Sequence, residues 1–115
     1  MSSKSIFEIQ ADFCRCMSSA VRIQIIYVLR NGPQRVSEIA RITNYGQTMI
    51  SRHLTHLRNS GVVSSHREGQ EVICHITNQK IVEICDLMRE VLKEEASRRS
   101  KLAEEFQDEY TEGIS

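Results

Sequence analysis

A short segment in the middle of the chain combines basic, amide and hydroxyl side chains and contains no acidic residue. From residue 47 it reads Gln-Thr-Met-Ile-Ser-Arg-His-Leu-Thr-His-Leu-Arg. Guanidinium groups hold guanine edges or phosphates, amides pair with adenine, and hydroxyl groups reach phosphate oxygens. The candidate nucleic-acid contacts on this segment are Gln47, Thr48, Ser51, Arg52, His53, His56 and Arg58.

Four cysteines offer a second kind of chemistry. Thiolates bind soft ions such as As(III) and react with oxidants or reactive sulfur species. In a regular helix, Cys14 and Cys16 point about 200° apart, so they share an ion only if the helix opens near Ser18. Cys85 is then the expected third ligand, and Cys74 is expected to be a separate or packed thiol. Free cysteines also pack as small hydrophobic residues, so all four being structural is the alternative.

Apolar periodicity predicts the helices that position these groups. One helix is expected over residues 4–17, and a second runs from caps at residues 18–19 to the terminator at residues 31–33. A short helix over residues 36–43 and a turn precede the polar helix, expected over residues 47–60. On that helix the inner positions are Ile50, Leu54 and Leu57. A short helix, a turn and a helix with a polar basic face form the arrangement that enters the major groove of DNA.

The second half of the chain predicts a β-hairpin and a last helix. Strands over residues 62–66 and 72–76 enclose a turn over residues 67–71, in which Gly69 supplies the positive φ of a hairpin. Beyond residue 80, an apolar stripe recurs at helical spacing. The remaining elements are too small to cover this stripe, so it requires a partner.

The stretch Ile50-Ser51-Arg52-His53-Leu54-Thr55-His56-Leu57-Arg58-Asn59-Ser60-Gly61-Val62-Val63 resembles the recognition helix and first wing strand of ArsR/SmtB-type repressors. The similarity extends over about residues 8–95. It implies a mainly α fold with a β-hairpin wing (α+β), the winged helix-turn-helix. It further implies a homodimeric repressor that leaves a palindromic double-stranded DNA operator when an inducer binds. By this resemblance, the DNA-facing residues are Gln47, Thr48, Ser51, Arg52 and His53, with Arg67 on the wing.

The resemblance also places the dimer interface on the first and last helices. The interface residues expected there are Ile6, Ile9, Phe13, Ile84, Met88, Val91 and Leu92. For three residues of the polar helix over residues 47–60, an interpretation other than DNA contact remains open. His53 and His56 are equally compatible with ordinary surface or partly packed histidines, and Arg58 with local pairing.

The usual metal sites of the family are missing at the matching positions. Third-helix cysteine positions hold Arg35 and Ser37, and no cysteine lies in that helix for a dithiol sensor. The last-helix ligand positions hold Asn78, Lys80, Val91 and Glu94. The expected inducer is therefore As(III) or another thiophilic metal ion at Cys14, Cys16 and Cys85. The alternative is a redox or reactive-sulfur signal at the same cysteines.

Charge and length set the remaining expectations. The 115-residue chain has a formal net charge of zero, yet residues 13–70 carry a net charge of +6 and the rest carries −6. A basic middle with acidic ends indicates a nucleic-acid-facing module on a solvated or self-associating frame. We expect one domain over residues 1–96, then an acidic extension over residues 97–115 that is helical and then frays.

Composition also bears on the other classes of protein. The chain has no secretory signal and no apolar run near the roughly 20 residues that span a bilayer, so a cytoplasmic protein without a membrane partner is expected. It has no Gly-rich phosphate loop and no convincing nucleophile and base, so an enzyme is not expected. A winged helix that binds only other proteins is the remaining alternative. The acid-free basic helix argues against it.

Overall fold

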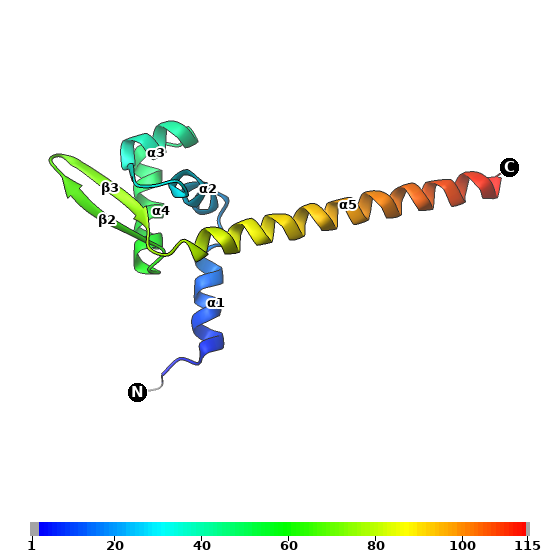
Figure 1. The fold of residues 1–115 in the computed structure, drawn as a ribbon, viewed down its shortest axis with the longest axis horizontal. Coiled ribbons are helices and arrows are strands. Elements are labelled where there is room, and N and C mark those ends of the chain that lie inside the picture. Colours follow the sequence, from blue (N-terminus) through cyan, green and yellow to red (C-terminus); the bar gives the residue numbers. More distant parts are fainter. Residues whose placement is uncertain (1–2, 115) are drawn as a thin grey trace. The chain divides into compact units, whose positions relative to one another are not determined.

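The computed structural model describes residues 3–114, with side chains described for residues 3–106 (Figure 1). Its elements in chain order are α1 (Ile6–Cys16), α2 (Ala20–Leu29), β1 (Gln34–Arg35), α3 (Val36–Thr43), α4 (Gln47–Asn59), β2 (Val63–Glu68), β3 (Glu71–Ile76) and α5 (Lys80–Ile114). The predicted winged helix-turn-helix is confirmed. No helix in this described range is both long and apolar enough to cross a bilayer.

The chain divides into two compact units, Met1–Val82 and Glu83–Ser115. The first holds the winged helix, and the second holds all but the first residues of α5. The expected domain boundary between residues 96 and 97 stays a prediction. Ser115, the last residue of the expected extension, lies outside the described residues.

Local side-chain contacts explain where the first helices begin. The Ser5 hydroxyl accepts from the Glu8 N–H and the Glu8 carboxylate accepts from the Ser5 N–H, a capping box that starts α1. At α2, the Ser19 hydroxyl accepts from the Arg22 N–H. Of the two serines predicted as caps, Ser19 is therefore the one that starts α2. Ser18 instead donates to the Arg15 carbonyl.

The sheet has one strand more than predicted. Its order is β1-β3-β2 with antiparallel pairing, and Gln34 and Arg35 lie opposite Cys74 and Ile73. A two-residue strand is too short to show a period of two, so only its pairing with β3 reveals it. The predicted hairpin of two strands is corrected in this respect.

The wing is also tighter than predicted. β2 continues to Glu68 and β3 begins at Glu71, so the turn is the two residues 69 and 70 rather than residues 67–71. Gly69 has φ 61°, the conformation that the sequence predicted for it. Arg67 consequently lies within β2, opposite Val72, instead of in the turn.

The core of the first unit fixes α4 in place. Its fully buried side chains come from α2, α3, α4, the residue before β2, and β3. They are Ile25, Ile26, Leu29, Ile39, Ile50, Leu54, Leu57, Val62 and Cys74. Because three of these side chains belong to α4, the direction of its opposite face is set by apolar packing.

Candidate nucleic-acid interface

Helix α4 has one buried and one exposed face, as its sequence predicted. Ile50, Leu54 and Leu57 are 0% exposed. The exposed side chains include Gln47, Thr48, Ser51, Arg52, His56 and Arg58. No acidic residue lies on α4, and no side chain caps its start at Gly46. The outer face therefore presents positive and hydrogen-bonding groups at a helix N-terminus, which favours anions.

Arg58 links the end of α4 to the wing. One guanidinium nitrogen donates to the Ser65 hydroxyl on β2 over 3.1 Å, and another donates to the Thr55 hydroxyl over 3.2 Å. Arg58 was open to two interpretations, a DNA contact or local pairing, and these hydrogen bonds show that local pairing is present. Both partners are neutral and Arg58 is exposed, so its charge remains directed to solvent between helix and wing.

Among the predicted contact residues, His53 has a partly buried side chain. Its Nδ1 accepts from the Arg22 Nε over 3.3 Å, and another Arg22 nitrogen donates to the Cys16 carbonyl over 3.1 Å. Partial burial, followed by the positive charge of Arg22, lowers the pKa of His53. A neutral ring that accepts at Nδ1 holds the start of α2 and the end of α1 against α4. The sequence did not indicate this role for Arg22.

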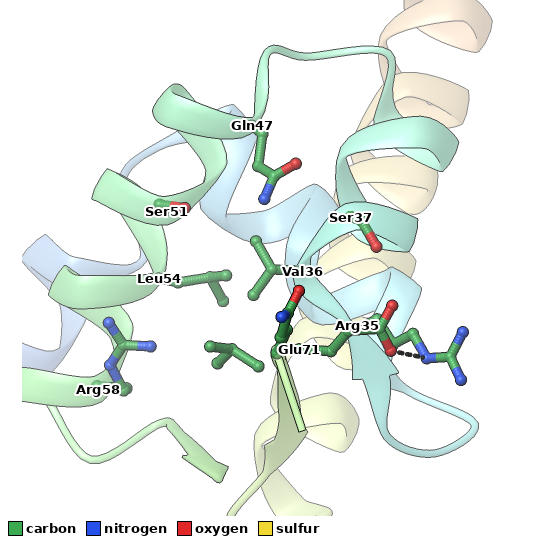
Figure 2. Close-up of a pocket in the computed structure, with 10 residues that line it drawn as sticks. Arg35, Val36, Ser37, Gln47, Ser51, Leu54, Arg58 and Glu71 are labelled. Carbon is green, nitrogen blue, oxygen red and sulfur yellow. Dashed lines mark ion pairs between the residues drawn. The ribbon is translucent and has the colours of Figure 1, made fainter. Parts of the chain in front are cut away.

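A surface hollow of about 270 Å³ lies between α4, the start of α3 and the wing (Figure 2). Gln47, Ser51 and Arg58 line it from α4, and Arg35 forms an ion pair of 2.7 Å with Glu71 at its edge. Glu71 is already balanced by this partner. The hollow therefore adds polar groups beside the outer face of α4 without an uncompensated negative charge.

The wing carries Arg67 as an exposed side chain two positions before the two-residue turn. Its neighbour His66 lies 3.1 Å from the Glu68 carboxylate. The hairpin formed by β2 and β3 follows directly on α4 (Figure 1). Helix α4 and the wing thus present two separate basic surfaces in the unit Met1–Val82.

Cys14 and Cys16, two of the cysteines predicted to act together, lie in different surroundings. α1 stays helical through Cys16, and the Met17 N–H closes its last turn on the Phe13 and Cys14 carbonyls. Cys14 is exposed, whereas Cys16 is buried and its thiol donates to the His56 carbonyl over 3.9 Å. Cys85 is buried as well. Within the described residues, no three His, Cys, Asp or Glu side chains form a group able to hold a metal ion.

The other two thiols are in poorly reactive surroundings. Cys74 is fully buried in β3, as the packed-thiol interpretation predicted. Burial raises the pKa of the Cys74 thiol, and burial together with the nearby Asp86 carboxylate raises the pKa of Cys85. Thiolate formation at both is therefore disfavoured relative to a free cysteine.

The fold and the acid-free face of α4 define a winged helix-turn-helix of the DNA-binding type. Residues 19–65 match the family model described as bacterial regulatory protein, arsR family. The chain is 28% identical over 81 residues to the transcriptional repressor SmtB of Mycobacterium tuberculosis, an alignment that covers 70% of this chain and 60% of SmtB. In sequence and in fold the chain is therefore similar to the ArsR/SmtB family.

The chain is also similar to a second regulator and to a solved homodimeric domain. The cadmium resistance transcriptional regulatory protein CadC of Listeria innocua is 33% identical over 76 residues, 65% of this chain and 64% of CadC. The solution structure of the homodimeric winged helix-turn-helix DNA-binding domain Mb0332 of Mycobacterium bovis superposes with a TM-score of 0.72 at 24% identity. That match covers 85% of this chain and 95% of Mb0332 and shows the shared fold.

Proposed function

We propose that the protein is a homodimeric transcriptional repressor that binds a palindromic double-stranded DNA operator. The observation that carries this proposal is the outer face of α4, which is exposed, basic and free of acidic side chains. An α-helix with its side chains is about 10–12 Å wide, and the major groove is about 12 Å wide. The apolar side of α4 is held in the core, so the polar side is the one that enters the major groove.

The proposed contacts divide by chemistry. Arg52 is exposed near the middle of α4 and suits a guanine edge, while Gln47 at its start suits adenine or a phosphate. Arg58, held by two hydroxyl groups at the start of the wing, suits a phosphate, and Arg67 extends the contact along the wing. His53 acts as a positioning residue because its ring is tied to Arg22. Thr48, Ser51 and His56 complete the proposed set.

Binding of the full chain to a duplex operator is expected to weaken steeply with salt. Each phosphate neutralised by Arg or Lys releases counterions, so log K falls against log salt with a slope of about −0.9 per phosphate contact. Fluorescence anisotropy of an operator selected from a random duplex pool measures this slope. A complex that is insensitive to salt, or a selection that enriches no sequence, would instead support the protein-interaction alternative.

The homodimer is proposed from apolar side chains that stay exposed within one chain. On α1, Ile6 is 69% and Ile9 52% exposed, and on α5 the predicted stripe is similarly open. Its predicted members are Ile84, Met88, Val91 and Leu92. Two exposed apolar residues that the prediction did not include are Leu87 on α5 and Phe7 on α1. Phe13 is half-buried. Exposed apolar side chains repeated along a helix mark an association site, and the homodimeric Mb0332 offers a parallel.

Replacing Val91 with Glu is expected to abolish the dimer at the low concentrations used in DNA binding. A charge in an apolar interface loses its water without gaining a partner, and a palindrome read by one subunit loses the gain of two linked contacts. Operator affinity should fall by about 10²-fold or more. Light scattering and anisotropy measure the two effects. The matched control is Glu90→Gln beside it, and a dimeric Val91→Glu protein would contradict the interface.

For the signal, we infer that a thiol-directed inducer acts through Cys14, Cys16 and Cys85. Cys16 carries the strongest support, because its sulfur touches the backbone of α4 at His56. Any group added to that sulfur must displace α4 or the end of α1. Cys14 supplies an exposed thiol on the same helix. The similarity to the cadmium resistance regulator CadC supports a soft ion such as Cd(II), and As(III) follows from the same thiolate chemistry. The proposed cytoplasmic location keeps these thiols reduced.

Cys14 is exposed and Cys16 is buried, so they differ in access to a soluble agent, and oxidants and soft ions are tested side by side. As(III), Cd(II), peroxide and polysulfide are added in turn to the protein–operator complex. Cys14→Ser/Cys16→Ser is expected to lose most of the release, and Cys85→Ser part of it, while Cys74→Ser responds normally. Release by As(III) and Cd(II) alone identifies a soft ion as the inducer. Release by peroxide and polysulfide alone identifies a redox signal. An unchanged response of the double variant would refute the thiol model.

A further inference from the structure

Helix α5 continues well past the apolar stripe proposed for the dimer, and this second part has a pattern of its own. Side chains that are three, four, seven and eleven positions apart lie on one face of an α-helix. The residues of α5 that share such a face are Glu95, Arg98, Arg99, Leu102, Glu105 and Phe106. Leu102 is 48% exposed and Phe106 72% exposed. We name this surface the 95–106 face.

The charged residues of α5 on and beside the 95–106 face change sign along the helix. Arg98, Arg99 and Lys101 precede Leu102, whereas Glu104 and Glu105 follow it. Glu95 pairs with Arg98 and Arg99 over 2.5 and 3.2 Å. Among the side chains that the structure describes, Glu104 and Glu105 form no ion pair. The helix thus carries a basic segment and an uncompensated acidic segment on either side of one leucine.

We propose that two copies of the chain pair antiparallel through the 95–106 face, with the two-fold axis at Leu102. In that register, each residue after Leu102 lies opposite the residue equally far before it. Glu105 then meets Arg99 of the second copy, and Phe106 meets Arg98, whose cation stacks on the ring. A parallel pair would place Arg against Arg and Glu against Glu, so the charges select the antiparallel direction.

This contact joins a further copy and does not repeat the proposed DNA-binding dimer. Two antiparallel helices related by a two-fold axis have one centre of pairing. A pair centred on the stripe from Ile84 to Leu92 is therefore not also centred on Leu102. Each DNA-binding dimer has two such faces, and one contact between a face of each joins two dimers. The expected species is a tetramer able to hold two operators.

Sedimentation velocity of the full chain over a wide concentration range tests this proposal. The wild-type protein is expected to change from dimer to tetramer, and Leu102→Glu to remain a dimer at every concentration. Arg99→Glu and Glu105→Arg alone should each weaken the tetramer, and the two together should restore it because the pair is only reversed. Ser100→Glu, on the opposite face of α5, is the matched control. A wild-type protein that stays dimeric, or a double variant that is not restored, overturns the proposal.

Operator binding separates this proposal from the proposed function. At the low protein concentrations of an anisotropy titration, Leu102→Glu should bind a single operator with wild-type affinity. On DNA with two operators, the wild-type protein should bridge both sites and Leu102→Glu should not. Equal bridging by the two proteins would overturn the role of the 95–106 face while leaving single-operator binding intact.

Discussion

Arg52→Ala is expected to weaken operator binding by about 5- to 150-fold and to leave the fold unchanged. A bidentate Arg–guanine contact contributes about 1–3 kcal/mol of discrimination, which corresponds to that range. Arg52 is exposed, and its neighbour Leu54 rather than Arg52 holds α4 in the core. Substitutions at such surface positions change stability by about 0.5 kcal/mol or less. Anisotropy with the selected operator and thermal unfolding measure the two quantities.

The sequence dependence of that loss distinguishes base recognition from simple attraction. If Arg52 reads a base, the variant should lose its preference at one operator position and retain its affinity for unrelated DNA. Arg41→Ala is the matched control, because Arg41 is an exposed arginine on α3 that pairs with Glu38. An equal loss on operator and unrelated DNA would assign Arg52 to a phosphate. No loss on either would remove it from the interface.

The two-faced character of α4 was predictable because it depends on local periodicity. Ile50, Leu54 and Leu57 recur at helical spacing, and the structure buries all three. Gly69 was also predictable, since a two-residue hairpin turn requires positive φ and glycine adopts it freely. Ser19 as a cap follows from its hydroxyl and its position before an apolar run. Each of these features is determined by residues within a few positions of one another.

Contacts between distant parts of the chain were not predictable from the sequence. Arg22 and His53 are 31 positions apart, and Cys16 and His56 are 40 apart. Nothing local to α1 indicates that Cys16 faces α4 while Cys14 faces solvent. From the sequence alone, both thiols could belong to one ion site. The structure shows that one of them touches the backbone of the recognition helix, which is a different route for a signal.

The resemblance supplied what periodicity alone does not. A polar helix after a tight turn predicts a nucleic-acid contact, but the dimer and the inducer followed from the family. The exposed apolar side chains of α1 and α5 give the dimer a physical basis in this chain. The missing family ligands at Arg35 and Ser37 direct attention to other thiols, and those two positions instead line the hollow beside α4 (Figure 2).

Leu57→Ala is expected to lower the free energy of unfolding by about 2–5 kcal/mol, the range for a buried leucine that leaves a cavity. Leu57 is fully buried on the inner face of α4, and its carbonyl accepts from the Val62 N–H at the start of the wing. Chemical denaturation measures the loss. Leu57→Met, which conserves volume, should cost less than about 1.5 kcal/mol. A similar loss in both variants would show that backbone contacts rather than packing hold this end of α4.

Operator binding by the same variant tests whether the two faces of α4 act separately. Where Leu57→Ala remains folded, its outer face is unchanged, so its affinity per folded molecule should stay within a few-fold of the wild-type value. Arg52→Ala should show the reverse, with normal stability and weak binding. If Leu57→Ala instead loses affinity while fully folded, the packing beneath α4 sets the angle at which the helix enters the groove. A thiol signal that pushes on α4 from Cys16 would then act through the same packing.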